Sequence, residues 1–179
     1  MQQKIVITGG PGTGKSTVIN ELERRGFYCI HEISRQVTLD AREKGIEQLF
    51  LTNPLLFSEM LLEGRTNQYI SASNSDPELV FFDRGIPDVF AYMDFTNSKY
   101  PTKFKQLSKE HLYSTVFLMP PWKDIYKSDN ERYESYEESL EIYRHIKNAY
   151  TELEYSIIEV PFGSVKERTD FVLESLLIK

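Results

Sequence analysis

Eight residues near the N-terminus have the types and the spacing of a phosphate-binding loop, or P-loop. The stretch Gly9-Gly10-Pro11-Gly12-Thr13-Gly14-Lys15-Ser16 fits G-x-x-x-x-G-K-[ST]. In such loops backbone N–H groups surround the phosphates of a nucleoside triphosphate, the lysine reaches the β- and γ-phosphates, and the hydroxyl coordinates Mg²⁺. The predicted nucleotide-binding residues are Gly10, Pro11, Gly12, Thr13, Gly14, Lys15, Ser16 and Thr17.

The residues on either side of this loop favour a functional P-loop over a glycine-rich turn that holds no ligand. Residues 4–8 form an apolar, β-branched run, as expected of a buried parallel strand. Residues 16–23 follow with helical spacing, and Gly26 ends that helix after two arginines. A helix that starts at the loop directs its free N–H groups and the positive end of its dipole toward an anion.

A second acidic site is predicted at Asp83, which ends the apolar run Leu79-Val80-Phe81-Phe82. A P-loop needs a carboxylate on a neighbouring strand to hold Mg²⁺, directly or through water. The other strong strand candidate, 115–119, ends in two prolines and offers no acid. We therefore predict Ser16 and Asp83 as metal ligands. The alternative for Asp83 is a carboxylate that caps the next helix.

Arg84 follows Asp83 directly, which would place a guanidinium at the mouth of the same cleft. It could hold an anionic acceptor or a transferring phosphoryl group. The alternative is an ordinary surface ion pair with Asp88.

The segment His31-Glu32-Ile33-Ser34-Arg35 comes just after the second predicted strand. Ligands of open α/β sheets bind beyond the carboxyl ends of the strands, so Glu32 and Arg35 should face the cleft. Glu32 could act as the general base on an acceptor hydroxyl or anchor that hydroxyl by a hydrogen bond. Alternatively, it is a carboxylate at a helix N-terminus. His31 is expected to be structural.

A polar segment, about residues 123–135, is predicted to be a lid that closes over the triphosphate and excludes water. Arg132 is the candidate cation of this lid, and Lys127 is the second choice. The alternative is a solvated surface segment.

Composition limits the classes of function. A net charge of −6 over 179 residues disfavours nucleic acid as a partner. The sequence contains no apolar run of membrane-spanning length and no signal-peptide layout. The single cysteine, Cys29, suits a reducing compartment, so we expect a cytoplasmic protein with this thiol buried as a small hydrophobe.

Strands and helices alternate along the chain, which predicts an α/β fold with a parallel sheet covered on both faces. Helices are expected from Pro54 to about Ser71 with Asn53 as the N-cap, from Ser135 to about Leu153, and from Ser164 with a capping box to Glu167. Further strands are predicted at 27–30, 79–82, 114–119 and 155–160.

Four segments together resemble a family of small AAA-type P-loop proteins related to the ribosylnicotinamide kinase domain of NadR. They are the P-loop itself, residues 31–35, residues 81–88 with the sequence FFDRGIPD, and residues 130–135 with the sequence NERYES. Residues 159–173 continue the match, so the resemblance covers nearly the whole chain, 1–179, as one domain.

This resemblance implies a three-layer P-loop NTPase fold with a five-stranded parallel sheet in the order 2-3-1-4-5. It also implies a site for Mg²⁺ and ATP, with GTP as the alternative. Lys15 and Ser16 would bind phosphate and metal, Arg132 would be the lid arginine, and four residues would serve the acceptor site: Glu32, Arg35, Asp83 and Arg84.

The leading hypothesis is phosphoryl transfer from Mg²⁺-ATP to a small nucleoside- or nucleotide-like acceptor. The candidate catalytic residues are Lys15, Glu32, Asp83, Arg84 and Arg132. The sequence lacks the N-K-x-D and D-x-x-G motifs of small GTPases and the L-S-G-G-Q signature of transporter ATPases. The runner-up is an ATP- or GTP-binding regulatory module with slow hydrolysis and no small-molecule acceptor, and a structural protein with a vestigial P-loop is third. The sequence leaves the oligomeric state open.

Overall fold

A single parallel sheet forms the centre of the molecule in the computed structural model, which describes residues 2–43, 45–46, 49–126 and 134–177. Its strands run in the order β2-β3-β1-β4-β5, and every pairing is parallel. This confirms the predicted fold class and strand order. The strands are β1 (Gln3–Gly9), β2 (Tyr28–Ile30), β3 (Leu79–Asp83), β4 (Thr115–Met119) and β5 (Ile157–Glu159).

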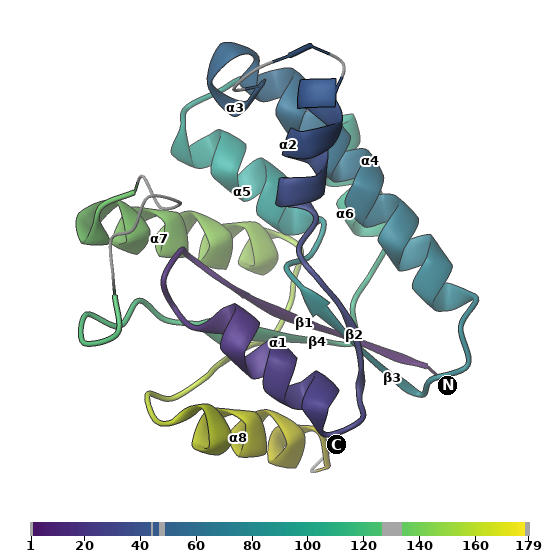
Figure 1. Cartoon of the computed structure of the whole chain (residues 1–179), viewed down its shortest axis with the longest axis vertical. Helices are drawn as coiled ribbons and strands as arrows, with labels where there is room; N and C mark the ends of the chain where they lie inside the picture. The colour runs from purple at the N-terminus through teal and green to yellow at the C-terminus, as the bar shows by residue number, and fades with distance from the viewer. Residues whose placement is uncertain (1, 44, 47–48, 127–133, 178–179) are drawn as a thin grey trace.

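Helices cover both faces of the sheet and make three layers. Figure 1 shows α1 and α8 together on one face, with α4, α5, α6 and α7 on the other and α2 and α3 packed beyond them. The helices are α1 (Lys15–Arg24), α2 (Ser34–Glu43), α3 (Leu49–Thr52), α4 (Pro54–Ser73), α5 (Pro87–Phe95), α6 (Lys103–Glu110), α7 (Tyr136–Glu152) and α8 (Val165–Leu177).

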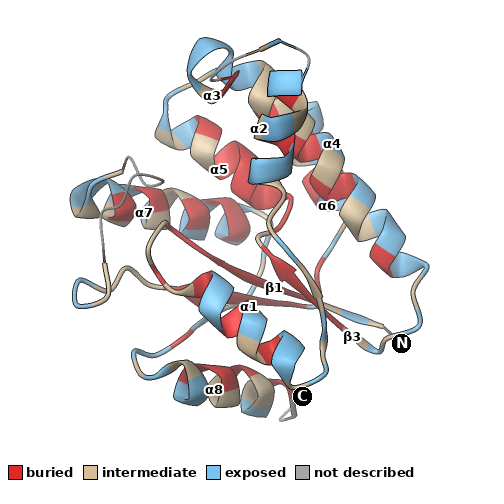
Figure 2. Cartoon of the chain, viewed as in Figure 1, coloured by how far each residue is buried: buried red, intermediate tan, exposed pale blue. Residues whose placement is uncertain are grey.

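Alternation of side chains along β1 divides the core in two. Ile5 and Ile7 pack on the α1 and α8 side with residues such as Leu22 and Val172, whereas Val6 packs on the opposite side. All three β1 side chains are fully buried, because a central parallel strand is covered on both faces. Figure 2 shows the buried residues concentrated in the sheet and on the inward faces of the helices.

The predicted helix starts are confirmed by their hydrogen bonds. The Asn53 side chain accepts the Leu56 N–H at 3.1 Å, with proline at the first helical position of α4. At α8 the Glu167 carboxylate accepts the Ser164 N–H, and the Ser164 hydroxyl accepts the Glu167 N–H. These bonds satisfy N–H groups that a helix start would otherwise leave free.

Several boundaries differ from the sequence-based ones. β5 covers Ile157–Glu159, which is shorter than the predicted 155–160, because this strand lies at the edge of the sheet and pairs with β4 alone. The sequence pattern does not define the bounds of helices α2, α3 and α6, because each of them buries only one or two residues. No helix in the described part of the chain has the length and apolar character needed to cross a membrane.

Cys29 lies on β2, where its thiol points to the Ile19 carbonyl at 3.6 Å. Burial raises its pKa to about 12, so the thiol stays protonated at neutral pH. The prediction of a buried small hydrophobe thus holds for the unreactive thiol, although Cys29 is only partly buried.

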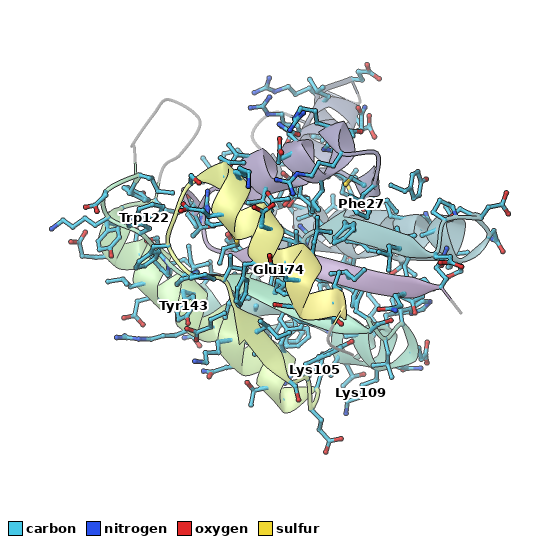
Figure 3. The ribbon with its side chains drawn as sticks, turned by 90° about the horizontal axis from the view of Figure 1, so that it is seen from below. Phe27, Lys105, Lys109, Trp122, Tyr143 and Glu174 are labelled. Atoms are coloured by element: carbon cyan, nitrogen blue, oxygen red, sulfur yellow. The ribbon has the colours of Figure 1, made fainter. Side chains whose placement is uncertain are left out.

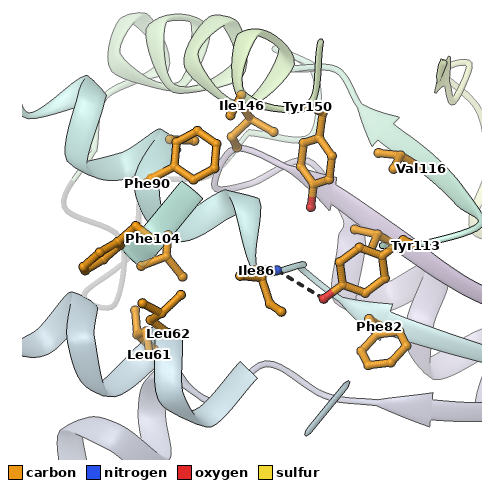
Figure 4. Packing of buried hydrophobic residues seen from close by; sticks show 14 of the residues in the cluster. Leu61, Leu62, Phe82, Ile86, Phe90, Phe104, Tyr113, Val116, Ile146 and Tyr150 are labelled. Atoms are coloured by element: carbon orange, nitrogen blue, oxygen red, sulfur yellow. Dashed lines mark hydrogen bonds between the residues drawn. The ribbon is translucent and has the colours of Figure 1, made fainter. Parts of the chain in front are cut away.

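A buried polar cluster around Asp88 joins the sheet to helices α5 and α7. Asp88 is fully buried and accepts hydrogen bonds from the Thr8 hydroxyl at 2.5 Å, the Gly85 N–H at 3.0 Å and the Tyr150 hydroxyl at 2.7 Å. Figure 4 shows Tyr150 and Tyr113 reaching into the turn before α5, where the Ile86 N–H donates to the Tyr113 oxygen. One carboxylate therefore links β1, that turn and α7.

Replacing Tyr150 with Phe should lower the free energy of unfolding by about 1–2 kcal/mol, because the Asp88 carboxylate loses a donor where water cannot replace it. Urea unfolding would measure this. Tyr143→Phe, which removes an exposed hydroxyl that donates to Glu159, is the matched control and should change stability by less than about 0.5 kcal/mol. Equal losses in the two variants would contradict the role given to Asp88.

Candidate functional site

The predicted P-loop connects β1 to α1 and closes tightly on itself. The Lys15 ammonium donates to the Gly10 carbonyl at 2.6 Å, and the Thr13 hydroxyl donates to the same carbonyl at 3.1 Å. Gly12 has φ +71°, and a Cβ there would stand 2.8 Å from the ring of Tyr126. Glycine is thus required at this position by both the backbone conformation and the neighbouring ring.

Lys15 is the cation at the centre of the loop, and its side chain is buried. Burial, reinforced by the nearby Arg84, lowers the pKa of Lys15 to about 7, although Asp83 and Asp88 act in the opposite direction. A desolvated ammonium of this kind gains most from an anionic partner, because the surrounding dielectric is low.

Ser16 and Asp83 meet at the carboxyl end of β3, as predicted. The Ser16 hydroxyl donates to one Asp83 oxygen at 3.4 Å, and the other oxygen is buried without a hydrogen-bond partner. Burial raises the pKa of Asp83, opposed by Lys15 and Arg84. Asp83 does not cap α5. In the turn before this helix, the Gly85 N–H donates to Asp88 and not to Asp83.

These two oxygen donors fit Mg²⁺. The ion is commonly held by one or two carboxylates with substrate phosphates and water completing the octahedron. The free Asp83 oxygen is the ligand atom that the described structure leaves available. The described residues include no cluster of three or more acidic, histidine or cysteine ligands, so a site made of protein ligands alone is not present among them.

Arg84 connects the P-loop to the second predicted site. Its guanidinium donates to the Gly9 carbonyl at 3.0 Å, pairs with Asp88 at 3.2 Å and pairs with Glu32 at 2.8 Å. Its backbone φ is +72°, a strained conformation for a residue with a side chain. The alternative of an ion pair with Asp88 is confirmed as a contact, but the pair is not at the surface, because Asp88 is completely buried and the Arg84 side chain is only 13% exposed.

Glu32 lies at the start of α2, as the structural alternative predicted, and its role toward an acceptor stays a prediction. Its carboxylate accepts the N–H groups of Ile33 and Ser34 at the start of α2 and also binds the two arginines Arg65 and Arg84. Burial alone would raise the pKa of Glu32, but the two guanidinium groups outweigh it and hold the pKa below its ordinary value. Glu32 is therefore ionised at neutral pH.

Sequence reasoning missed two buried arginines at the site. Arg65 on α4 donates to both Glu32 oxygens and to the Gly85 carbonyl at 3.1 Å. Arg168 on α8 donates to the Thr13 carbonyl at 2.8 Å. Each lies among buried positions of its helix, and an arginine on an otherwise buried helical face is the signal that could have revealed it.

Other predicted residues are exposed or lie outside the described residues. Arg35 is exposed on the first turn of α2, and His31 is exposed with its ring 3.2 Å from Glu23. Thr17 is exposed, with its hydroxyl on the Gly14 carbonyl. The candidate lid cations Arg132 and Lys127, and with them residues 127–133 of the predicted lid, lie outside the described residues.

A glycine-rich loop after the first strand of a parallel sheet in the order 2-3-1-4-5 defines the P-loop kinase-like class of folds. Residues 4–168 match the family described as the AAA domain, and the chain belongs to that family. The predicted likeness to small AAA-type P-loop proteins is thereby confirmed. A nucleotide-binding protein of Pseudomonas savastanoi pv. phaseolicola is 25% identical over 120 residues. That match covers 63% of this chain and 39% of the relative, so the chain spans well under half of it.

Solved kinases share the fold at low identity. Deoxyadenosine kinase from M. mycoides, with dCMP and dCDP bound, has a TM-score of 0.71 and 17% identity over 99% of this chain and 100% of that one. NadR in complex with NR has a TM-score of 0.74 and 14% identity, and the match covers 98% of this chain and 50% of NadR.

The Glu32 ion pairs should make the free energy of unfolding depend on pH in the acidic range. The pKa of Glu32 in the folded protein lies below its ordinary 4.5. The ion pairs of Glu32 therefore contribute fully to the free energy of unfolding above pH 4.5, the ordinary pKa. This contribution is lost as the pH falls from there through the lower pKa of Glu32 in the folded protein. Wild type should exceed Glu32→Gln in stability at pH 7, and the difference should shrink toward pH 3.

Chemical unfolding at a series of pH values measures that difference. Glu59→Gln is the matched control, because Glu59 pairs with the half-exposed Lys103 and loses an ion pair of the surface type. A gap between wild type and Glu32→Gln that stays constant down to pH 3 would argue against the ion-pair account.

Proposed function

We propose that this protein transfers the γ-phosphoryl group of ATP to the hydroxyl of a small nucleoside- or nucleotide-like acceptor. The observation that supports this most is the continuous polar chain that joins the phosphate loop to a second site. Arg84 contacts the Gly9 carbonyl at 3.0 Å and the Glu32 carboxylate at 2.8 Å. A site on each side of one guanidinium is the arrangement that two reacting groups need.

The nucleotide would lie in the P-loop. Backbone N–H groups of residues 10–17 would surround the phosphates, and Lys15 would pair with the β- and γ-phosphate oxygens. Ser16 and Asp83 would hold Mg²⁺, which supplies charge neutralisation between the β- and γ-phosphates when it is bound. GTP is the alternative nucleotide, because no residue of the motif reads the base.

The acceptor would lie beside Glu32. In the transfer, the acceptor oxygen forms a bond to the γ-phosphorus, the bond from that phosphorus to the β–γ bridging oxygen breaks, and ADP leaves. The hydroxyl proton passes to a carboxylate. Glu32 and Asp83 are the two candidates for this proton: Glu32 is ionised but already binds Arg65 and Arg84, and Asp83 would also serve the metal. Arg84 would stabilise the charge of the moving phosphoryl group.

Arg35 and Arg132 complete the proposal. Arg35, on the first turn of α2, would bind the distal part of the acceptor, and Arg132 would approach the phosphates from the predicted lid, about residues 123–135. One described residue of that segment, Tyr126, has its ring against Gly12 of the P-loop. We propose that residues 1–179 act as one domain of this kind, and that it works in the cytoplasm.

Lys15→Ala should lower acceptor-stimulated ADP release by about a hundredfold or more, because the developing charge on the phosphates loses its central cation. The measurement is ADP release from Mg²⁺-ATP with and without nucleosides, nucleotides and pyridine nucleosides. Lys109→Ala, on the exposed last turn of α6, is the matched control and should retain wild-type turnover.

Three outcomes decide the function. Lys15-dependent release stimulated by an acceptor supports the kinase. Tight nucleotide binding with slow release that no acceptor stimulates supports the regulatory module instead. Full activity of Lys15→Ala would exclude both.

Asp83→Asn should raise the Mg²⁺ concentration needed for half-maximal turnover by about tenfold or more, because the metal loses its anionic protein ligand. A Mg²⁺ titration of ADP release measures the shift. Asp76→Asn, in the exposed loop before β3 at the opposite end of the sheet, should leave the titration unchanged. An unchanged Mg²⁺ requirement in Asp83→Asn would remove Asp83 from the metal site.

A further inference from the structure

Arg168 brings a second cation to the phosphate-binding loop, from the far end of the chain. Its side chain is buried, with 5% of its surface exposed. One terminal nitrogen donates to the Thr13 carbonyl at 2.8 Å, and the other lies 2.6 Å from where a Cβ on Gly14 would stand. Gly14 has φ +84°, so α8 packs its guanidinium directly against the backbone of the loop.

This guanidinium has no carboxylate partner among the described residues. The other buried cations of the site do have nearby acids, since Arg65 and Arg84 share Glu32 and Lys15 lies near Asp83. The Nε of Arg168 is also buried without a hydrogen-bond partner. A buried charge without a counter-ion is unfavourable, so an anion bound near this position would stabilise the guanidinium.

An aromatic pair holds the guanidinium in place. Arg168 lies 5.8 Å from the centre of the Trp122 ring, and Trp122 stacks on Phe162 with ring centres 5.0 Å apart. Figure 3 shows Trp122 on the side of the first turns of α8, far from Lys105 and Lys109. Cation–π contact fixes the plane of a guanidinium without neutralising its charge.

The bond to Thr13 acts on the peptide that joins Thr13 to Gly14. In a planar trans peptide the carbonyl and the following N–H point in opposite directions. Since the Thr13 carbonyl faces Arg168, the Gly14 N–H faces away from it, toward the side on which P-loop N–H groups surround phosphates. A charged donor on the carbonyl also polarises that N–H and makes it a stronger donor.

We propose that Arg168 is a positioning residue of the P-loop: it orients and polarises the Thr13–Gly14 peptide, and its buried positive charge, on the carbonyl side of that peptide, favours binding of a polyphosphate on the N–H side. The proposal rests on the proposed function in one respect: it requires the loop to bind a polyphosphate, and it holds whatever the acceptor is.

Arg168→Met should weaken binding of ATP and of inorganic tripolyphosphate by about tenfold or more, the loss expected for one charge-assisted hydrogen bond. Tripolyphosphate is the sharper probe because it carries no base or sugar. Isothermal titration with the full chain measures both affinities. Lys166→Met removes the same charge from an exposed position on α8 and should stay within about twofold of wild type.

The fluorescence of Trp122 gives a second measurement, which should respond to polyphosphate only if Arg168 takes part in binding it. Trp122 is the single tryptophan of the sequence, so the emission comes from this one ring and reports its surroundings, which include Arg168, Phe162 and Asp124. Tripolyphosphate should change this emission in wild type and in Lys166→Met, and the change should be absent in folded Arg168→Met. If Arg168→Met does not fold, Arg168→Lys tests the proposal in its place, because lysine keeps the positive charge but lacks the planar guanidinium with its fixed donors. It should bind tripolyphosphate at least about threefold more weakly than wild type.

Wild-type affinity in folded Arg168→Met, or in Arg168→Lys where the first variant fails to fold, would overturn the proposal. An equal loss in Lys166→Met would overturn it too, since net charge would then explain the effect. Failure of the proposed function looks different: wild type would bind tripolyphosphate in an Arg168-dependent way while no acceptor stimulated ADP release. Absence of polyphosphate binding in wild type would overturn both.

Discussion

The buried carboxylate of Asp88 is the interaction on which the rest of the structure depends. A charge without exposure must have donors on every side, and here a β1 hydroxyl, a turn N–H, an α7 hydroxyl and the Arg84 guanidinium supply them. These donors come from three parts of the chain: β1, the turn at residues 84–85 and α7. The carboxylate therefore fixes Arg84 in its strained backbone conformation, and Arg84 in turn fixes the distance between the phosphate loop and Glu32.

Electrostatic balance divides this site into two halves of different character. Around Glu32, two guanidinium groups share one carboxylate that also holds the start of α2. Around the phosphate loop, Lys15 is desolvated and Arg168 has no acidic partner among the described residues. The first half is preorganised without a ligand. The second half concentrates positive charge in a protein whose net charge is −6, so its field is local and directed at the loop.

The sequence predicted those parts of the structure that depend on local rules. The loop, the helix that follows it, the Asp83 position and the caps at Asn53 and Ser164 all follow from short patterns with a direct physical cause. The strand order came from the family resemblance and is confirmed by the pairing of β1 with both β3 and β4. The catalytic, nucleotide-binding, acceptor-binding and metal-binding roles of the site residues stay predictions, those of Arg35 and Arg132 among them.

What sequence reasoning missed depends on tertiary packing. Nothing local indicates that Arg65 on α4 would meet Glu32 at 2.9 Å or that Asp88 would be fully buried, since both depend on how α4, α5 and α7 pack on the sheet. The same packing determines that the ion pair between Arg84 and Asp88 is buried and not at the surface.

The contact between Arg168 and Thr13 joins residues that are 155 positions apart. Ribosomal synthesis proceeds from the N-terminus, so β1, the loop and α1 emerge long before α8 does. Until α8 emerges and docks, the Thr13 carbonyl lacks its hydrogen bond from Arg168. The nascent chain thus carries an incomplete anion site until α8 has been made.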